Sequence, residues 1–273
     1  MKPYIFSLIS SLLVASSANA IGTKADASCG GKDTPCVLES GRSYHVLFPD
    51  DWDGKADLPV MLHFHGWART GSHPLWSPRT GGETRKRGVL LIAPNGEGRT
   101  WNFWRAETSD VTFTNEVLAD VKKRFPIDED RLIISGYSYG SAMAWRYVCE
   151  SGEGVFALLA IAGSLDQTEI CSTAPRQVRH VHGVKDTVMD FPIGPGGDTT
   201  YPVALWRERL GCGPETGREN WSVSAKQTFE RVTWKDCKEG AVYLDLHSGG
   251  HLIPPGWVGR QLEEVLELPA KTQ

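Results

Sequence analysis

Short apolar runs alternate along the chain with longer stretches in which apolar residues recur every three or four positions. The short runs are typical of strands, and the longer stretches are typical of helices. We expect strands at residues 43–48, 59–64, 89–93, 132–135, 156–160, 178–182 and 241–246. Helices are expected at residues 115–123, 141–149, 201–209 and 258–266. This alternation predicts an α/β fold, in which helices cover both faces of a mostly parallel sheet.

The composition fits a single globular domain. The chain has 273 residues, of which 40% are hydrophobic and 23% are charged, so one core of ordinary size is expected. Two stretches rich in Gly, Pro and Ser, residues 68–83 and 190–200, fit neither helix nor strand and are expected as loops near the functional site. The net charge of −4, without a run of basic residues, argues against a nucleic-acid partner.

The first twenty residues have the layout of a signal peptide. Lys2 makes the start basic, residues 5–15 are apolar, and Ala18-Asn19-Ala20 is a small-x-small cleavage site. The apolar stretch is shorter than the roughly 20 residues that a membrane span needs. We therefore expect cleavage after Ala20, a secreted or periplasmic domain of residues 21–273, and no membrane partner.

The segment Gly136-Tyr137-Ser138-Tyr139-Gly140 places a G-x-S-x-G pattern between a predicted strand and a predicted helix. In that context the pattern forms a nucleophile elbow, a strained turn that lifts the serine hydroxyl above the edge of the sheet. The two glycines leave the room that such a turn requires. Ser138 is therefore the candidate nucleophile.

Acid and base candidates follow Ser138 in the order typical of an α/β-hydrolase. Asp186 comes after the strand predicted at residues 178–182, and His251 comes after the strand predicted at residues 241–246. Functional groups gather on such loops at the strand ends of open α/β sheets. Asp186 and His251 are therefore the candidate acid and base.

Other residues compete for these roles. Asp190 and Asp198 are alternatives for the acid, and His247 is an alternative for the base. The glycine pair before the favoured histidine argues against His247. His63 and His65 share a strand face and are candidate metal ligands, but such histidines more often support the adjoining loop, so no metal is expected.

With these residues in view, the chain resembles the secreted esterases grouped as polyhydroxybutyrate depolymerase-like and feruloyl esterase-like α/β-hydrolases. The matching stretches lie between about residues 44 and 257 and include His65-Gly66, the elbow, His182-Gly183-x-x-Asp186, Trp206 with Gly211-Cys212, and Gly249-Gly250-His251. The resemblance implies an α/β-hydrolase fold and a catalytic triad of Ser138, Asp186 and His251.

These residue types suit ester hydrolysis through an acyl-enzyme. His251 would act as general base and then as general acid, and Asp186 would orient its imidazole. The backbone amides of Trp67 and Tyr139 are the expected oxyanion hole, since the fold takes its donors from the turn after an early strand and from the residue after the nucleophile. This chemistry needs no cofactor.

Six cysteines in an exported chain predict three disulfides. The sequence by itself permits 15 pairings, and one pair of free thiols stays an alternative. Cys29 and Cys36 are near enough to close a small loop. The resemblance implies Cys212–Cys237, which leaves Cys149–Cys171.

The ten tryptophans suggest an aromatic acyl pocket. Candidates to line it are Trp67, Trp101, Trp104 and Trp206, of which Trp67 and Trp206 are the predicted substrate contacts. The alternative is that most tryptophans lie in the core.

The resemblance predicts a carboxylic-ester hydrolase for feruloyl- or acetyl-type esters of plant polysaccharide fragments. A depolymerase of polyhydroxybutyrate or its oligomers is the second hypothesis, disfavoured by the lack of an appended binding domain. A peptidase or acyltransferase would use the same triad. A non-catalytic carbohydrate-binding protein is a different class, and the intact Ser–Asp–His order argues against it. A monomer is expected, with a small or oligomeric ester as its partner.

Overall fold

The computed structural model describes residues 29–30 and 33–270. The predicted signal peptide, residues 1–20, lies outside the described residues. Within the described ranges, no helix has both the length and the apolar character needed to cross a membrane.

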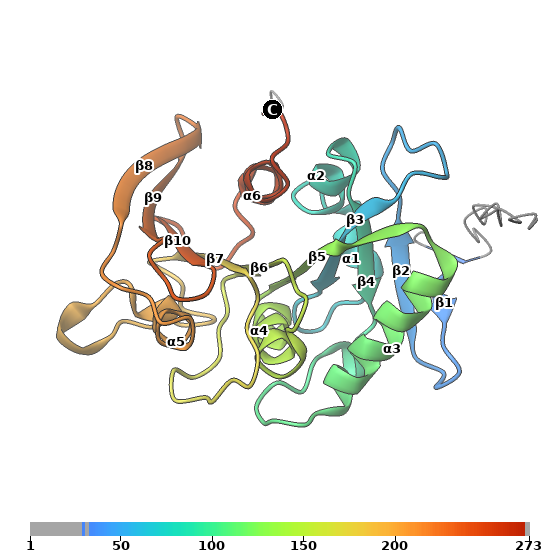
Figure 1. Ribbon diagram of the computed structural model, residues 1–273, viewed down its shortest axis with the longest axis horizontal. Helices are drawn as coiled ribbons and strands as arrows, with labels where there is room; N and C mark the ends of the chain where they lie inside the picture. Colours follow the sequence, from blue (N-terminus) through green and yellow to red (C-terminus); the bar gives the residue numbers. More distant parts are fainter. Residues whose placement is uncertain (1–28, 31–32, 271–273) are drawn as a thin grey trace, which may run out of the picture.

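The described strands form one ten-stranded sheet in the order β1-β2-β4-β3-β5-β6-β7-β10-β9-β8 (Figure 1). The six central strands, in the order β4-β3-β5-β6-β7-β10, pair in parallel. At the two edges of the sheet, β1, β2, β8 and β9 pair antiparallel. The strands are β1 (Cys36–Val37), β2 (Ser43–Leu47), β3 (Leu58–Phe64), β4 (Leu90–Pro94), β5 (Ile127–Tyr137), β6 (Ala157–Ile161), β7 (Gln177–Gly183), β8 (Gly217–Ser224), β9 (Gln227–Trp234) and β10 (Ala241–His247).

Helices cover both faces of this sheet, as predicted (Figure 1). The helices are α1 (Ser72–Trp76), α2 (Gly81–Lys86), α3 (Ser109–Arg124), α4 (Tyr139–Ser151), α5 (Ala204–Arg209) and α6 (Trp257–Val265). One apolar core lies under α3, α4 and α5 and includes Val117, Met143 and Leu205. The other lies under α1 and α6 and includes Leu75 and Leu262. Short 3₁₀ turns are Glu97–Arg99, Pro195–Gly197 and Tyr201–Val203.

The central strands are apolar on both sides because each residue faces one core or the other. In β3, Val60, Leu62 and Phe64 belong to the core under α4, whereas Met61 belongs to the core under α6. This period of two is the geometry of a strand. Strands buried on both faces are therefore nearly continuous apolar runs, which is the pattern that predicted them.

All seven predicted strands and four predicted helical segments are present, with small shifts of their ends. The largest differences are that β5 and α3 begin earlier than predicted and that residues 201–209 divide into a 3₁₀ turn and α5. The loop expected at residues 68–83 instead contains α1 and the start of α2. Both helices are short and lie among Gly, Pro and Ser residues, so the sequence did not predict them. The β8–β9 hairpin was also missed, since its turn at residues 225–226 lacks the Asn or Gly of a typical two-residue hairpin.

All six cysteines form disulfides, and the three pairs are the expected ones: Cys29–Cys36, Cys149–Cys171 and Cys212–Cys237. The second ties the end of α4 to the loop after β6, and the third joins the loop after α5 to the loop before β10. Such cross-links typically contribute about 2–4 kcal/mol each, largely by restricting the unfolded chain.

Asp245 on β10 organises the buried polar contacts beneath α6. Its carboxylate accepts hydrogen bonds from the guanidinium of Arg231 at 2.8 Å and from the indole nitrogens of Trp221 and Trp257 at 2.8 and 2.7 Å. The Asp245 side chain is 1% exposed and that of Arg231 is 5% exposed. A buried charge of this kind is tolerated because it is paired and fully hydrogen-bonded.

We predict that Asp245→Ala lowers the free energy of unfolding by about 3–5 kcal/mol, because Arg231 and two indoles lose their buried acceptor. Urea unfolding followed by tryptophan fluorescence measures this change. The matched control is Glu230→Gln, which removes an acid from an exposed ion pair with Arg218 and should change the free energy by less than about 1 kcal/mol. Equal effects of the two substitutions would contradict the prediction.

Candidate active site

Ser138 lies in the sharp turn between β5 and α4, with a φ of 58° and a ψ of −126°. A positive φ at a residue with a side chain is strained and persists only where the surroundings hold it. Here the Ser138 amide donates to the carbonyl of Ile161 at 3.0 Å. The predicted elbow is thus present, and it points the serine to the carboxyl ends of the parallel strands.

Both glycines of the elbow are required by close backbone packing. A Cβ at Gly136 would lie 2.0 Å from the carbonyl oxygen of Gly140, and a Cβ at Gly140 would lie 2.1 Å from that of Phe64. No side chain fits at such distances. The pattern G-x-S-x-G therefore reflects the contact of β5, α4 and the end of β3.

A continuous hydrogen-bonded chain joins the three residues that the sequence singled out. The Ser138 hydroxyl lies 2.9 Å from Nε2 of His251, and Nδ1 of His251 lies 2.7 Å from Oδ2 of Asp186. With the proton on Nδ1, the ring donates to the carboxylate and accepts from the serine. The three residues come from loops after β5, β7 and β10, which the parallel sheet brings to one edge.

Asp186 is held as an anion in a buried position. Burial acts to raise its pKa, but hydrogen bonds from His251 and from the amides of Val188 and Met189 outweigh it, so the pKa lies below its usual value. His182 also contacts the carboxylate, with Nε2 3.4 Å from Oδ2 while it donates to the carbonyl of Met189 at 2.9 Å.

The alternatives for acid and base lie elsewhere. Asp198 caps its own turn by accepting from the amide and hydroxyl of Thr200, and Asp190 is exposed. His247 is buried and accepts the amide of Gly249 through Nδ1 at 3.1 Å. None of the three joins the chain that links Ser138 to Asp186.

The turn after β3 brings backbone amides to the serine. Gly66 packs beside Ser138, since a Cβ on this glycine would lie 3.6 Å from the Cβ of Ser138. The amide of Trp67, the next residue, has no acceptor in the described part of the chain. Tyr139 is the first residue of α4, where a backbone N–H has no partner within its helix. These are the two amides expected to hold an oxyanion.

His65 supports this turn, and His63 is hydrogen-bonded to the neighbouring strand β5. Nδ1 of His65 donates to the carbonyl of Gly66 at 2.8 Å, and its Nε2 accepts the amide of Gly96 at 3.0 Å. His63 is hydrogen-bonded to the Ser135 hydroxyl at 3.0 Å. Burial lowers the pKa of both rings, to about 3 for His63 and about 4 for His65. No cluster of three or more potential metal ligands occurs among the described residues.

The four candidate tryptophans divide into exposed and buried pairs. Trp67 and Trp104 are 67% and 59% exposed, and Trp104 packs edge-to-face against the Tyr139 ring at 5.4 Å. Trp101 and Trp206 are 1% and 0% exposed. Trp206 packs on Trp145 in the core under α4 and α5, so the prediction of Trp206 as a substrate contact is corrected: no substrate reaches a fully buried indole.

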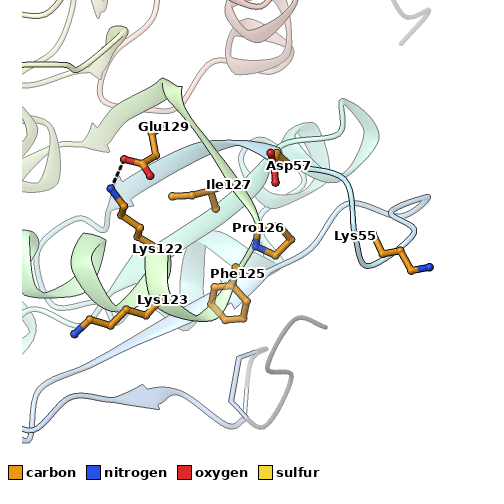
Figure 2. A pocket seen from close by; sticks show the side chains of 8 residues that line it. All are labelled: Lys55, Asp57, Lys122, Lys123, Phe125, Pro126, Ile127 and Glu129. Carbon is orange, nitrogen blue, oxygen red and sulfur yellow. Dashed lines mark hydrogen bonds and ion pairs between the residues drawn. The ribbon is translucent and has the colours of Figure 1, made fainter. Parts of the chain in front are cut away.

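A groove of about 420 Å³ runs alongside His251. It is lined by His73, Trp76, Ser77, Pro78, Arg79, Tyr137, His251, Leu252 and Ile253. A second cleft, of about 520 Å³, is shown in Figure 2. It lies where β3 and β5 begin, so it is at the opposite edge of the sheet from Ser138, and the ion pair of Lys122 and Glu129 spans part of it.

Sequence reasoning missed three residues of this site: Tyr137, His182 and Arg79. The Tyr137 ring packs on the His251 ring, with centroids 4.9 Å apart, and its hydroxyl donates to the His251 carbonyl at 3.2 Å. Tyr137 and His182 belong to quoted motifs, but only their contacts in space reveal what they touch. Arg79 lies in the stretch 68–83, which was predicted only as a loop near the functional site.

Comparison with known proteins finds similar esterases. Feruloyl esterase D of Neurospora crassa is 24% identical over 268 residues, covering 88% of this chain and 87% of that protein. Probable feruloyl esterase C of Aspergillus niger is 23% identical over 224 residues, covering 78% of this chain and 77% of that protein. Among solved structures, an acetyl xylan esterase from Aspergillus awamori matches with a TM-score of 0.60 at 14% identity, covering 83% of this chain and 94% of that one.

No family model matches the chain. The structural matches confirm the predicted α/β-hydrolase fold. The sequence matches confirm the expected resemblance to feruloyl esterases. The resemblance to polyhydroxybutyrate depolymerases stays a prediction.

Burial of His247 is expected to make the stability of the protein depend on pH. Burial lowers the pKa of His247 to about 4, whereas an unfolded histidine titrates near 6.5. Between these two values the unfolded chain binds more protons than the folded chain at this residue. The contribution of neutral His247 to the free energy of unfolding is therefore fully present above about pH 6.5 and is lost as the pH falls toward 4.

We therefore predict that His247→Asn makes stability less dependent on pH. Asparagine keeps an acceptor for the Gly249 amide but takes up no proton. Urea unfolding at pH 7, 6 and 5 should show a slope smaller than that of wild type by up to about 1.4 kcal/mol per pH unit. An unchanged slope would contradict a neutral, buried His247.

Proposed function

We propose that the protein is a serine carboxylic-ester hydrolase that acts on feruloyl- or acetyl-type esters of plant polysaccharide fragments. The observation that carries the proposal is the hydrogen-bonded chain of Ser138, His251 and Asp186, with distances of 2.9 and 2.7 Å. Curated relatives named feruloyl esterase and a structural neighbour named acetyl xylan esterase support the ester class.

The geometry supports a two-step reaction. Nε2 of His251 takes the Ser138 proton as the serine oxygen attacks the ester carbonyl, and the protonated ring then gives that proton to the leaving alcohol. The acyl group stays on Ser138 until a water molecule, deprotonated by the same ring, releases it as an acid. Asp186 keeps the ring in the required tautomer and stabilises its charged form.

The tetrahedral oxyanion would bind to the amides of Trp67 and Tyr139. Such donors act where charge develops in the transition state and are typically worth roughly 3–4 kcal/mol each. In this chain one amide comes from the turn after β3 and the other from the first turn of α4.

The acyl group would lie against aromatic surface. Trp67, itself a proposed oxyanion residue, and Trp104 are both largely exposed. Trp104, Phe103 and Tyr139 pack against one another with ring centroids 4.2–5.4 Å apart. Aromatic side chains offer a flat apolar face of this kind to a ring. This arrangement suits an aromatic acyl group such as feruloyl and leaves room for a smaller acetyl group.

The setting proposed for this reaction is outside the cytoplasm. Three disulfides suit an oxidising compartment, and the predicted signal peptide would deliver the domain of residues 21–273 there. The catalytic unit would work as a monomer, without metal or cofactor.

The first test compares wild type with Ser138→Ala on methyl ferulate, a hydroxybutyrate trimer and a p-nitrophenyl ester. Loss of the nucleophile should lower kcat by roughly 10⁴-fold or more on each ester that wild type hydrolyses. A preference for methyl ferulate supports the proposed substrate class, and a preference for the trimer favours a depolymerase. Well-folded wild type that hydrolyses none of the three would refute the esterase and favour a binding protein or a peptidase.

A second test concerns the acid. Asp186→Asn should lower kcat by roughly 10⁴-fold, because the asparagine amide favours the wrong tautomer of His251. The matched control is Asp190→Asn, which makes the same exchange four residues away at an exposed position and should retain wild-type kcat. Circular dichroism shows whether both variants are folded. A larger loss of kcat in Asp190→Asn than in Asp186→Asn would assign the role of the acid to Asp190.

A further inference from the structure

The groove beside His251 is positively charged, although the protein as a whole is negatively charged. The protein carries a net charge of −4, yet none of the described residues that line this groove is acidic, and Arg79 contributes a guanidinium. A basic groove on an acidic protein, next to the proposed catalytic base, selects for an anionic ligand.

Arg79 is anchored but not neutralised. It lies between α1 and α2, and one of its nitrogens donates to the carbonyl of Ile253 on the far side of the groove at 2.9 Å. Within residues 29–30 and 33–270 it has no acidic partner. Its remaining donors therefore face solvent in a fixed place. A guanidinium held in this way presents the planar fork that binds a carboxylate.

A second cation, Arg69, lies outside the residues that line the groove. Arg69 is exposed on the turn that follows Trp67 and forms no ion pair in the described part of the chain. Burial raises the pKa of the Tyr137 phenol, and Asp186 adds to the rise, whereas Arg69 and Arg79 both oppose it. Both guanidiniums thus act on the ring that packs against His251.

The position of the groove identifies the part of the ester that enters it. His251 gives its proton to the leaving oxygen, so this oxygen must lie within hydrogen-bonding reach of Nε2. The alcohol portion then continues past His251, along the groove that His251 borders with Leu252 and Ile253. The acyl portion lies on the other side, near Trp67 and Trp104.

Trp76 supplies a face for a ring in the same groove. Its side chain is 61% exposed although it is large and apolar. Indole faces bind flat ligands with an apolar side and polar edges, and a sugar ring is such a ligand. An arginine fork and an exposed indole in one groove suit a sugar that carries its own carboxylate.

We propose that this groove binds the alcohol portion of the ester as a uronic-acid unit, with Trp76 against the sugar ring and Arg79 on its carboxylate. The inference rests on the proposed function and narrows it: the preferred substrates are acyl esters of acidic oligosaccharides rather than of neutral ones.

The kinetic test uses two acetyl esters that differ in charge, mono-acetylated trigalacturonate and mono-acetylated xylotriose. Wild type should prefer the uronide, and 0.5 M NaCl should weaken the preference. Arg79→Gln should lower the ratio of kcat/KM for the uronide to kcat/KM for the neutral ester by about tenfold, chiefly through KM. The matched control is Arg176→Gln, the same exchange of an exposed arginine next to the first residue of β7, which should leave that ratio unchanged. A ratio that Arg79→Gln does not alter would overturn the inference.

A binding test separates this inference from the esterase itself. In the Ser138→Ala background, calorimetry should detect trigalacturonate binding, and adding Arg79→Gln should weaken it by about tenfold. Trp76→Ala should weaken the binding of trigalacturonate and of xylotriose alike. If wild type hydrolyses no ester while Arg79-dependent binding is present, the proposed function fails and the acidic-sugar site stands. Equal binding with and without Arg79 overturns the site, whether or not the protein is an esterase.

Discussion

Close backbone packing around Ser138 is the constraint on which the active site depends. Gly136, Gly140 and the end of β3 meet at distances that leave no room for a Cβ, and Ser138 is held with a positive φ between them. The turn after β3, which carries the Trp67 amide, is thereby brought against the turn that carries the Tyr139 amide. The strain at one serine is balanced by the two strands and the helix that fix it.

Burial then decides the charge states around that turn. His63, His65 and His247 are kept neutral because burial lowers their pKa values to between about 3 and 4. Asp186 stays ionised although it is buried, since three donors bind it. The same packing therefore keeps these three imidazoles neutral and keeps Asp186 ionised, so that Asp186 can orient His251.

The two sides of Ser138 differ in chemistry. Next to Tyr139, aromatic rings in tilted and edge-to-face contact make an apolar surface. Next to His251, an arginine and an exposed indole line a groove without acidic residues. Because the acyl and alcohol portions of an ester leave the reacting carbon in opposite directions, one site can select both portions independently. The proposed preference for acidic sugars follows from this division.

The order Ser138, Asp186, His251 was predicted from the sequence alone, because each residue comes a few positions after an apolar run that predicts a buried strand. The nucleophile elbow was also predicted from the sequence, because its two glycines are required by local steric constraints. The three disulfide pairs were also predicted from the sequence, together with the resemblance to the esterases.

Only the tertiary structure decided which side chains surround the candidate triad. Trp206 and Trp67 look alike in the sequence, but one is buried on Trp145 and the other is exposed at the site. The groove is built from residues of the α1–α2 region, β5 and the loop after β10, which are close only when the sheet is assembled. The sequence by itself determined which chemistry lies at the strand ends, because local patterns encode it. Which side chains surround that chemistry depends on contacts between segments more than one hundred residues apart, and no local pattern records them.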